Sequence, residues 1–157
     1  MSTTEPHGLY VTAFDLAQRH IGVKEVPGAE DNPRILAMLT LDQSWPPDDE
    51  TPWCSAFVNE IAWLLRLPRS KNLRARSWLG IGRSIPLDAA KIGFDVVILN
   101  RANGPQDPSV LEAPGHVGFY AGYENDRVLV LGGNQGNQVS IKPYDPAKLL
   151  GVRRLYG

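Results

Sequence analysis

The sequence predicts an α+β fold, in which N-terminal helices pack on a C-terminal antiparallel sheet of about five to six strands. Two observations carry this prediction. Apolar residues recur at helical spacing in the first half, whereas short runs rich in Val, Ile, Leu and aromatic residues, separated by turn residues, fill the second half. The 157 residues contain no evident linker or repeat. We therefore expect one catalytic domain over residues 1–157, with residues 1–8 as a flexible tail.

Two helices are predicted in the N-terminal third of the chain. Residues 9–21 carry apolar side chains at helical spacing and are closed by Gly22, a residue that commonly ends helices. Asn32 and Pro33 form the N-cap and the first position of the second helix, because Asn accepts a backbone hydrogen bond there and Pro lacks the N–H that would go unpaired.

The strongest helix of the sequence is predicted over about residues 52–66. Thr51 and Pro52 repeat the cap-then-proline signal at its start, and apolar side chains then follow one broad face. A further short helix is predicted over residues 72–81.

Strands are predicted throughout the second half. Each run is rich in β-branched or aromatic residues, and residues 124–126 (END) are typical of a hairpin turn between two of them. The predicted strands are residues 94–99, 116–122, 127–131, 138–142 and 150–155.

Composition narrows the function classes. The formal net charge of −1 gives no overall field that would attract nucleic acid, so we expect no nucleic-acid partner. One cysteine excludes an intramolecular disulfide, and with only three histidines it argues against a zinc site, so we expect no metal and no cofactor. No segment resembles a signal peptide or a membrane span. We expect synthesis in the cytoplasm without a signal peptide, and no membrane insertion.

Cys54 lies in the first turn of the helix predicted over residues 52–66. Unpaired N–H groups and the helix dipole favour negative charge there, which lowers the pKa of a thiol and makes it a usable nucleophile. A lone cysteine in an apolar stretch is also typical of a small buried hydrophobic residue. The position alone therefore leaves both interpretations open.

His116 begins a predicted strand and is the candidate general base for Cys54. The alternative is a strand-end histidine whose ring lies in solvent. His7, in the predicted tail, and His20, near a helix end, lack this context.

A cysteine–histidine pair needs a third polar group to orient the imidazole. In one register of the predicted hairpin, Asn134 lies opposite His116, and its amide oxygen accepts from the ring. A register that differs by one residue brings Gln135 there instead, and a bulge at residues 132–133 changes the pairing again. We favour Asn134; a polar turn without a catalytic role is the alternative.

Several segments resemble the CHAP and NlpC-type papain-like cell-wall hydrolases. Residues 51–58 (TPWCSAFV) resemble the cysteine-bearing helix start of this family, residues 114–120 (PGHVGFY) its histidine strand, and residues 128–135 (VLVLGGNQ) the strand with its third polar residue. Residues 21–28 and 32–35 look like the N-terminal part of a compact phage-associated branch. The order of cysteine, histidine and polar residue also matches.

The resemblance implies a papain-like core and hydrolysis of peptidoglycan, with Cys54, His116 and Asn134 as catalytic residues. Many relatives carry a glutamine a few residues before the cysteine as a donor to the oxyanion. Here residues 51–53 are Thr, Pro and Trp, and Gln43 lies far upstream. The backbone N–H of Cys54 is the alternative donor.

Other residues are candidates for the substrate groove. Trp53 is adjacent to the nucleophile, and aromatic rings suit sugars and peptides. The resemblance places Glu25 in a loop near the groove, where a carboxylate would meet an amine of the stem peptide. Core packing, for the aromatic residues, and solvation or helix capping, for the loop, are the alternatives. The substrate-binding candidates are Trp53, Gln135, Glu25, Asn32, Trp78 and Tyr120.

We therefore expect a monomeric, bacteriolytic peptidoglycan hydrolase, with endopeptidase activity on the stem peptide or cross-link favoured over N-acetylmuramoyl-L-alanine amidase activity. A phage endolysin or virion-associated lysin is favoured, which would act on the cell wall after delivery by a holin or a virion. The alternatives are a secreted antibacterial effector with an immunity protein as partner, and a non-catalytic wall-binding module. The basic run at residues 66–76 fits an anionic polymer or merely a solvated face.

Overall fold

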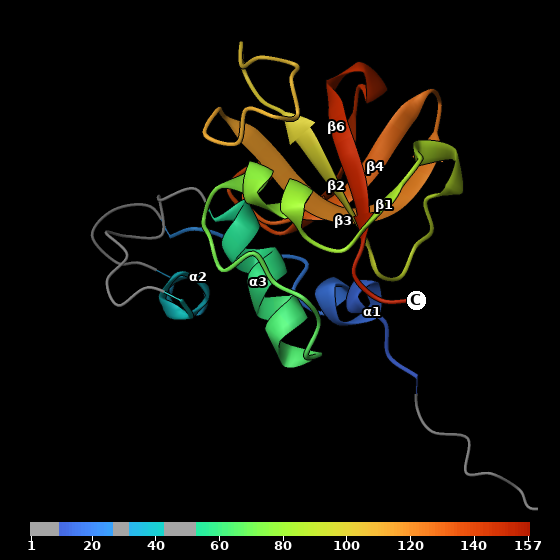
Figure 1. The fold of residues 1–157 in the computed structure, drawn as a ribbon. Coiled ribbons are helices and arrows are strands. Elements are labelled where there is room, and N and C mark those ends of the chain that lie inside the picture. Colours follow the sequence, from blue (N-terminus) through green and yellow to red (C-terminus); the bar gives the residue numbers. More distant parts are fainter. Residues whose placement is uncertain (1–9, 27–31, 43–52) are drawn as a thin grey trace, which may run out of the picture.

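The computed structural model describes residues 10–26, 32–42 and 53–157 (Figure 1). The predicted tail, the Thr51-Pro52 signal and Gln43 lie outside these residues. The elements are α1 (Ala13–Gln18), α2 (Pro33–Thr40), α3 (Cys54–Leu64), β1 (Arg83–Ile85), β2 (Asp95–Asn100), β3 (Gly115–Glu124), β4 (Arg127–Gly132), β5 (Ser140–Tyr144) and β6 (Leu149–Arg154).

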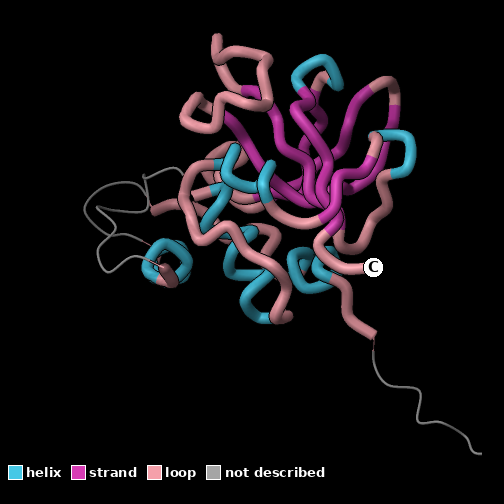
Figure 2. The backbone as a smooth tube through the Cα atoms, in the orientation of Figure 1, coloured by secondary structure: helices cyan, strands magenta, loops and turns pink. Residues whose placement is uncertain are grey.

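Helices form one layer and an antiparallel sheet forms the other (Figures 1 and 2). The sheet has six strands in the order β1-β6-β2-β3-β4-β5. Helices α1 and α3 pack against β3, and α2 packs against α3. The predicted α+β fold is confirmed.

The first two helices begin where local capping chemistry dictates. Thr12 and Asp15 form a reciprocal capping box at the start of α1, so the helix starts later than predicted, at Ala13, and it ends at Gln18, before the predicted end at Gly22. The Asn32 side chain accepts from the N–H of Arg34 and caps α2, with Pro33 at the first position. Both cap signals at α2 are therefore confirmed.

Helix α3 is the central helix of the molecule. Its side chains are buried on most sides, as expected for a helix that packs on the sheet and on its neighbouring helices. The ring of Phe57 meets that of Phe119 on β3 edge to face, with centroids 6.1 Å apart. This packing fixes the N-terminus of α3, and hence Cys54, against the start of β3.

The central strand β2 is apolar on both of its faces. Val96 and Ile98 belong to the core shared with the helices, whereas Val97 and Leu99 belong to a second apolar cluster. That second cluster includes residues of the outer strands, among them Tyr144 of β5. Both faces of β2 are therefore buried, as a near-continuous apolar strand requires.

Further details differ from the predictions. The segment predicted as a helix at residues 72–81 is a 3₁₀ helix over Ala75–Gly80, and strand β1 was not predicted. The hairpin of β3 and β4 contains a bulge between Tyr120 and Gly122. Within the described residues, no helix is long and apolar enough to cross a bilayer.

Candidate active site

Cys54 is the first residue of α3, and only 3% of it is exposed. Burial raises the pKa of the thiol, but hydrogen bonds and charge from His116 oppose it, as do the backbone groups of Val117 and Ser55. The net effect holds the pKa of Cys54 below its ordinary value. The position at the head of the helix acts in the same direction, because the unpaired N–H groups favour an anion.

His116 is the second residue of β3 and pairs with Leu99 of β2. Burial lowers the pKa of its imidazole, whereas the Cys54 thiol and the hydrogen bond with Gln135 raise it, so that the net pKa lies above the ordinary value. The positive charge of Arg101 opposes this rise. A lowered thiol pKa beside a raised imidazole pKa favours a thiolate–imidazolium pair.

Gln135 completes a buried hydrogen-bonded chain behind His116. Its Oε1 lies 2.8 Å from Nε2 of the imidazole, while its Nε2 donates to the carbonyls of Val130 (3.1 Å) and Ser140 (2.7 Å). Because two carbonyls can only accept, the Gln135 amide orientation is fixed, with the oxygen facing the ring. His116 Nε2 must therefore carry a proton, which leaves Nδ1 to exchange a proton with Cys54.

The structure brings Gln135, and not Asn134, to the imidazole. Pairing of Phe119 with Leu131 gives the register that would place Asn134 opposite His116. However, β4 ends at Gly132, and Asn134 has a φ of +58°, so the chain turns before that pairing is reached. Within the described residues, no hydrogen bond joins Asn134 to His116. The residue that contacts the imidazole is thus Gln135, one position after the favoured Asn134.

Tyr144 is a site residue that the sequence analysis missed. Its ring stacks on that of His116 with centroids 5.3 Å apart, and its hydroxyl donates to Gln135 Oε1 over 3.0 Å. Burial and the nearby Cys54 raise the pKa of Tyr144 to about 12, so the hydroxyl keeps its proton and remains a donor. Nothing in the sequence pointed to this contact, because β5 reaches His116 only through the pairing of β4 with β5.

Two glycines allow the chain to pass close to these side chains. A Cβ at Gly133 would lie 2.6 Å from the ring of Trp53, and one at Gly132 would lie 2.8 Å from Gln135 Oε1. Only glycine fits at such distances without movement of its neighbours.

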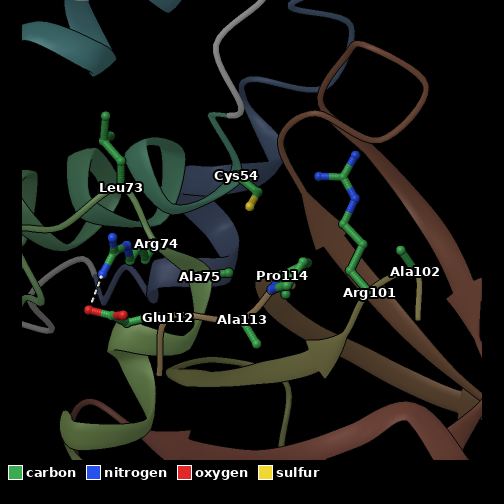
Figure 3. Close-up of a pocket in the computed structure, with 10 residues that line it drawn as sticks. Cys54, Leu73, Arg74, Ala75, Arg101, Ala102, Glu112, Ala113 and Pro114 are labelled. Carbon is green, nitrogen blue, oxygen red and sulfur yellow. Dashed lines mark hydrogen bonds and ion pairs between the residues drawn. The ribbon is translucent and has the colours of Figure 1, made fainter. Parts of the chain in front are cut away.

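A cavity of about 390 Å³ opens beside Cys54 (Figure 3). We call it the Cys-side cavity. Arg74 and Glu112, which form an ion pair of 3.1 Å, lie at one side of it, and Arg101 lies at the other. Its wall consists of Cys54, Leu73, Arg74, Ala75, Arg101, Ala102, Glu112, Ala113, Pro114 and Gly115.

A second cavity, of about 310 Å³, lies beside the imidazole. We call it the His-side cavity. Arg101 lines both cavities, so it stands where they adjoin. The wall of the His-side cavity consists of Asn100, Arg101, His116, Asn134, Gln135, Gly136, Asn137, Lys142 and Tyr144.

The aromatic substrate-binding candidates are core residues instead. Trp53 and Trp78 are fully buried, and the Trp78 indole donates to Ser55 Oγ over 2.9 Å. Tyr120 packs in the second apolar cluster with Val97 and its neighbours. Apolar burial, not ligand binding, explains all three aromatic positions.

The loop candidates have structural partners. Glu25 accepts from the Trp53 indole over 2.8 Å, and Asn32 caps α2 while its amide donates to the carbonyl of Lys24 over 2.7 Å. Neither residue lines either of the two cavities. The structure thus supports the interpretation of Asn32 as a helix cap.

The basic run at residues 66–76 does not form one charged face. Arg69 pairs with Asp42 at 2.6 Å and Arg74 pairs with Glu112. Arg76 is fully buried. Arg69, Arg74 and Arg76 therefore serve separate structural contacts, whereas Arg66 and Lys71 are exposed beside Arg69. Within the described residues, no cluster of three or more His, Cys, Asp or Glu residues could hold a metal ion.

Three solved structures resemble the chain in fold. NlpC2 from Trichomonas vaginalis aligns with a TM-score of 0.58 and 17% identity, over 96% of this chain and 49% of that one. NlpC1 from the same organism gives a TM-score of 0.55 and 16% identity, over 92% and 43% of the two chains. The peptidoglycan hydrolase RipB from Mycobacterium tuberculosis gives 0.55 and 18%, over 93% and 64%.

The chain therefore spans less than two thirds of the length of each of these structures. No family model matches the sequence, and no curated protein matches it either. The likeness to NlpC-type structures confirms the expected papain-like α+β fold.

Proposed function

We propose that this protein hydrolyses amide bonds of peptidoglycan, with Cys54 as nucleophile, His116 as general base and acid, and Gln135 as the residue that positions the imidazole. The observation that carries the proposal is that the buried Cys54 thiol lies beside the His116 imidazole, which is hydrogen-bonded to Gln135, next to an open cavity. The fold shared with RipB, a peptidoglycan hydrolase, supports the substrate class.

The proposed reaction has two halves. The Cys54 thiolate attacks the amide carbonyl, and the imidazolium of His116 gives its Nδ1 proton to the leaving amine as the C–N bond breaks. A thioester remains on Cys54. Neutral His116 then takes a proton from a water molecule that attacks the thioester, and Cys54 departs as the thiolate.

The oxyanion of each tetrahedral intermediate needs a donor. In our proposal this donor is the backbone N–H of Cys54, because the N–H groups of the first helical turn point toward a developing negative charge. The Trp53 indole is not available for this role, since it donates to Glu25.

Among peptidoglycan amides, we favour a peptide bond in the stem or cross-link. Cys54 lines one cavity and His116 lines another, so both segments that flank an internal peptide bond find space. Digestion of purified peptidoglycan with mass analysis tests this choice: shortened stems support an endopeptidase, whereas whole stems with free L-alanine termini would assign an amidase.

Substitution of the nucleophile is the direct test of the enzyme. Cys54→Ala should reduce the release of fragments from peptidoglycan by more than about 1000-fold, because the covalent route is lost. The thermal melting curve of the variant controls for folding. If the protein were instead a non-catalytic wall-binding module, the wild type would release no fragments, and iodoacetamide would fail to label its Cys54 at neutral pH.

We also propose that the hydrolase reaches the wall as a phage lysin, delivered by a holin or carried in the virion. The resemblance of residues 21–28 and 32–35 to a phage-associated branch supports this role. Neighbouring holin or tail genes would agree with it, whereas a neighbouring immunity gene would point to a secreted effector.

A further inference from the structure

We infer that the His-side cavity is a carboxylate-binding subsite for the leaving amine, with Arg101 and Lys142 as its cationic groups. The inference rests on the proposed hydrolase function and deepens it. It defines the preferred substrates as amides whose amine fragment carries a free carboxylate close to the cleaved bond.

The position of the cavity follows from the direction of proton transfer. The leaving amine receives its proton from His116, so the amine fragment must lie on the side of the imidazole. The His-side cavity is lined by His116 and Gln135, whereas Cys54 lines the other cavity, beside which the acyl fragment becomes a thioester. The two cavities therefore correspond to the two products of the reaction.

The charge of the cavity wall favours an anion. Its lining holds Arg101 and Lys142 together with amide side chains, and no carboxylate. Neither cation forms an ion pair with a residue in the described ranges. Glu112, the acid in the wall of the adjoining cavity, is already paired with Arg74. A bound carboxylate would thus supply the negative charge that the described residues do not provide to Arg101 and Lys142.

Arg101 is placed to act on the reacting groups as well as on the leaving fragment. It extends from the end of β2 beside Cys54 and lines both cavities (Figure 3). Burial has the largest effect on both neighbouring groups: it lowers the pKa of His116 and raises that of Tyr144. The positive charge of Arg101 lowers the pKa of both groups. The field of Arg101 therefore reaches the centre of the site.

Alkylation of Cys54 tests the anion site without any peptidoglycan. Iodoacetate and iodoacetamide react in the same way, because the thiolate displaces iodide from the CH₂ carbon of each. Iodoacetate carries a carboxylate, whereas iodoacetamide carries a neutral amide. Since Cys54 is the only cysteine of the chain, the mass of the intact protein reports its labelling. The ratio of the two rate constants measures attraction of an anion beside the sulfur.

Arg101→Gln should lower the ratio of iodoacetate to iodoacetamide rates by about tenfold, because a close charge is lost. Arg101→Lys should keep most of the ratio. Arg127→Gln, which removes an exposed cation at the far end of the hairpin, is the matched control and should leave the ratio unchanged. Added salt should lower the ratio of the wild type, because Arg101 is exposed and ionic strength screens exposed charges. An unchanged ratio in Arg101→Gln would overturn the inference.

A pair of stem peptides tests the leaving-group side itself. The two peptides are identical except that the free carboxylate on the amine fragment is a carboxamide in one of them. The wild type should cleave the carboxylate form with a kcat/KM about tenfold higher, and both Arg101→Gln and Lys142→Gln should reduce this preference. Equal cleavage of both peptides by the wild type overturns the subsite and leaves the hydrolase intact. If Cys54 is alkylated but neither peptide nor peptidoglycan is cleaved, the proposed hydrolase function is wrong. The ratio of the two alkylation rates still tests the anion site in that case.

Discussion

Gln135 gives the imidazole its working tautomer. Its Nε2 donates to two carbonyl oxygens, so its Oε1 must face His116 and accept a hydrogen bond from the Nε2–H of the imidazole. Tyr144 donates to the same oxygen and stacks on the ring, which limits rotation of both groups. The basic nitrogen of His116 is thereby held toward Cys54 before substrate arrives.

Removal of the Gln135 amide should therefore reduce catalysis. In Gln135→Ala we expect a loss of roughly 10- to 100-fold in kcat with little change in KM, the size expected when a hydrogen bond to a charged group is lost. Gln18→Ala, on the exposed side of α1, is the control. Asn134→Gly, which preserves the positive φ of that residue, should keep kcat within about twofold; an equal loss in both variants at residues 134 and 135 would contradict the assignment of Gln135.

The pH dependence of Cys54 reactivity should depend on His116. Burial raises the pKa of the thiol and the imidazole lowers it, so His116→Ala should shift the pKa of Cys54 upward. The measurement is the rate of iodoacetamide labelling against pH. In the wild type, reactivity should appear at a pH below that of an ordinary thiol, because the pKa of Cys54 is lowered.

Activity of the wild type should fall on both sides of its optimum. On the acid side the thiolate is lost as the pH drops through the lowered pKa of Cys54, and on the alkaline side the imidazolium loses its proton as the pH rises through the raised pKa of His116. A profile of kcat/KM without an alkaline limb would contradict the role of His116 as the acid that protonates the leaving amine.

At the scale of elements, the site depends on how β4 ends. Gly132 and Gly133 let the strand end against α3 and lead into a turn whose Asn134 and Asn137 have φ values of +58° and +60°. Asn tolerates this region better than most residues. The turn then returns Gln135 to the sheet, where its side chain reaches the imidazole.

A side chain at Gly133 should therefore disturb the fold of the turn. In Gly133→Ala the new methyl would lie 2.6 Å from the Trp53 ring and 3.0 Å from Phe57 Cβ, so we expect the free energy of unfolding to fall by about 1–3 kcal/mol. Gly80→Ala is the matched control, because no atom lies within 4 Å of its Cβ position. Urea denaturation of both variants measures the difference; equal stability would show that the turn adjusts without cost.

At the scale of the whole molecule, Arg76 joins the 3₁₀ segment, the end of β2 and the loop before β3. All five of its N–H donors have acceptors: Nε donates to the carbonyl of Pro114, and the two terminal nitrogens donate to the Asn100 side chain and three further carbonyls. A buried guanidinium is tolerated because every donor is used. The loop that it holds carries Glu112 and Pro114 to the Cys-side cavity.

Loss of Arg76 should release that loop. For Arg76→Met we expect the free energy of unfolding to fall by about 3–5 kcal/mol, because four backbone carbonyls and the Asn100 side chain lose their donor. Protease cleavage within residues 101–114 should increase at the same time. Arg127→Met is the exposed control and should change neither quantity. A stable variant with an uncleaved loop would contradict this role.

The sequence determined the features that depend on local patterns. Helical spacing followed by β-rich runs predicted the α+β order, and capping chemistry predicted the start of α2 at Asn32 and Pro33. Cys54 and His116 were predicted from their own segments, because a helix start and a strand start can be recognised from neighbouring residues. The structure places these two side chains in contact.

Only the tertiary structure decided what surrounds that pair. Asn134 and Gln135 are adjacent in sequence, and the choice between them depended on a bulge and on the point where β4 ends. Tyr144 and Arg101 reach the site through strand pairing and a loop path, and Trp53 proved to be a fully buried core residue. Such contacts join residues far apart in the chain, and the energies that fix them are those of packing and register, which no local pattern encodes.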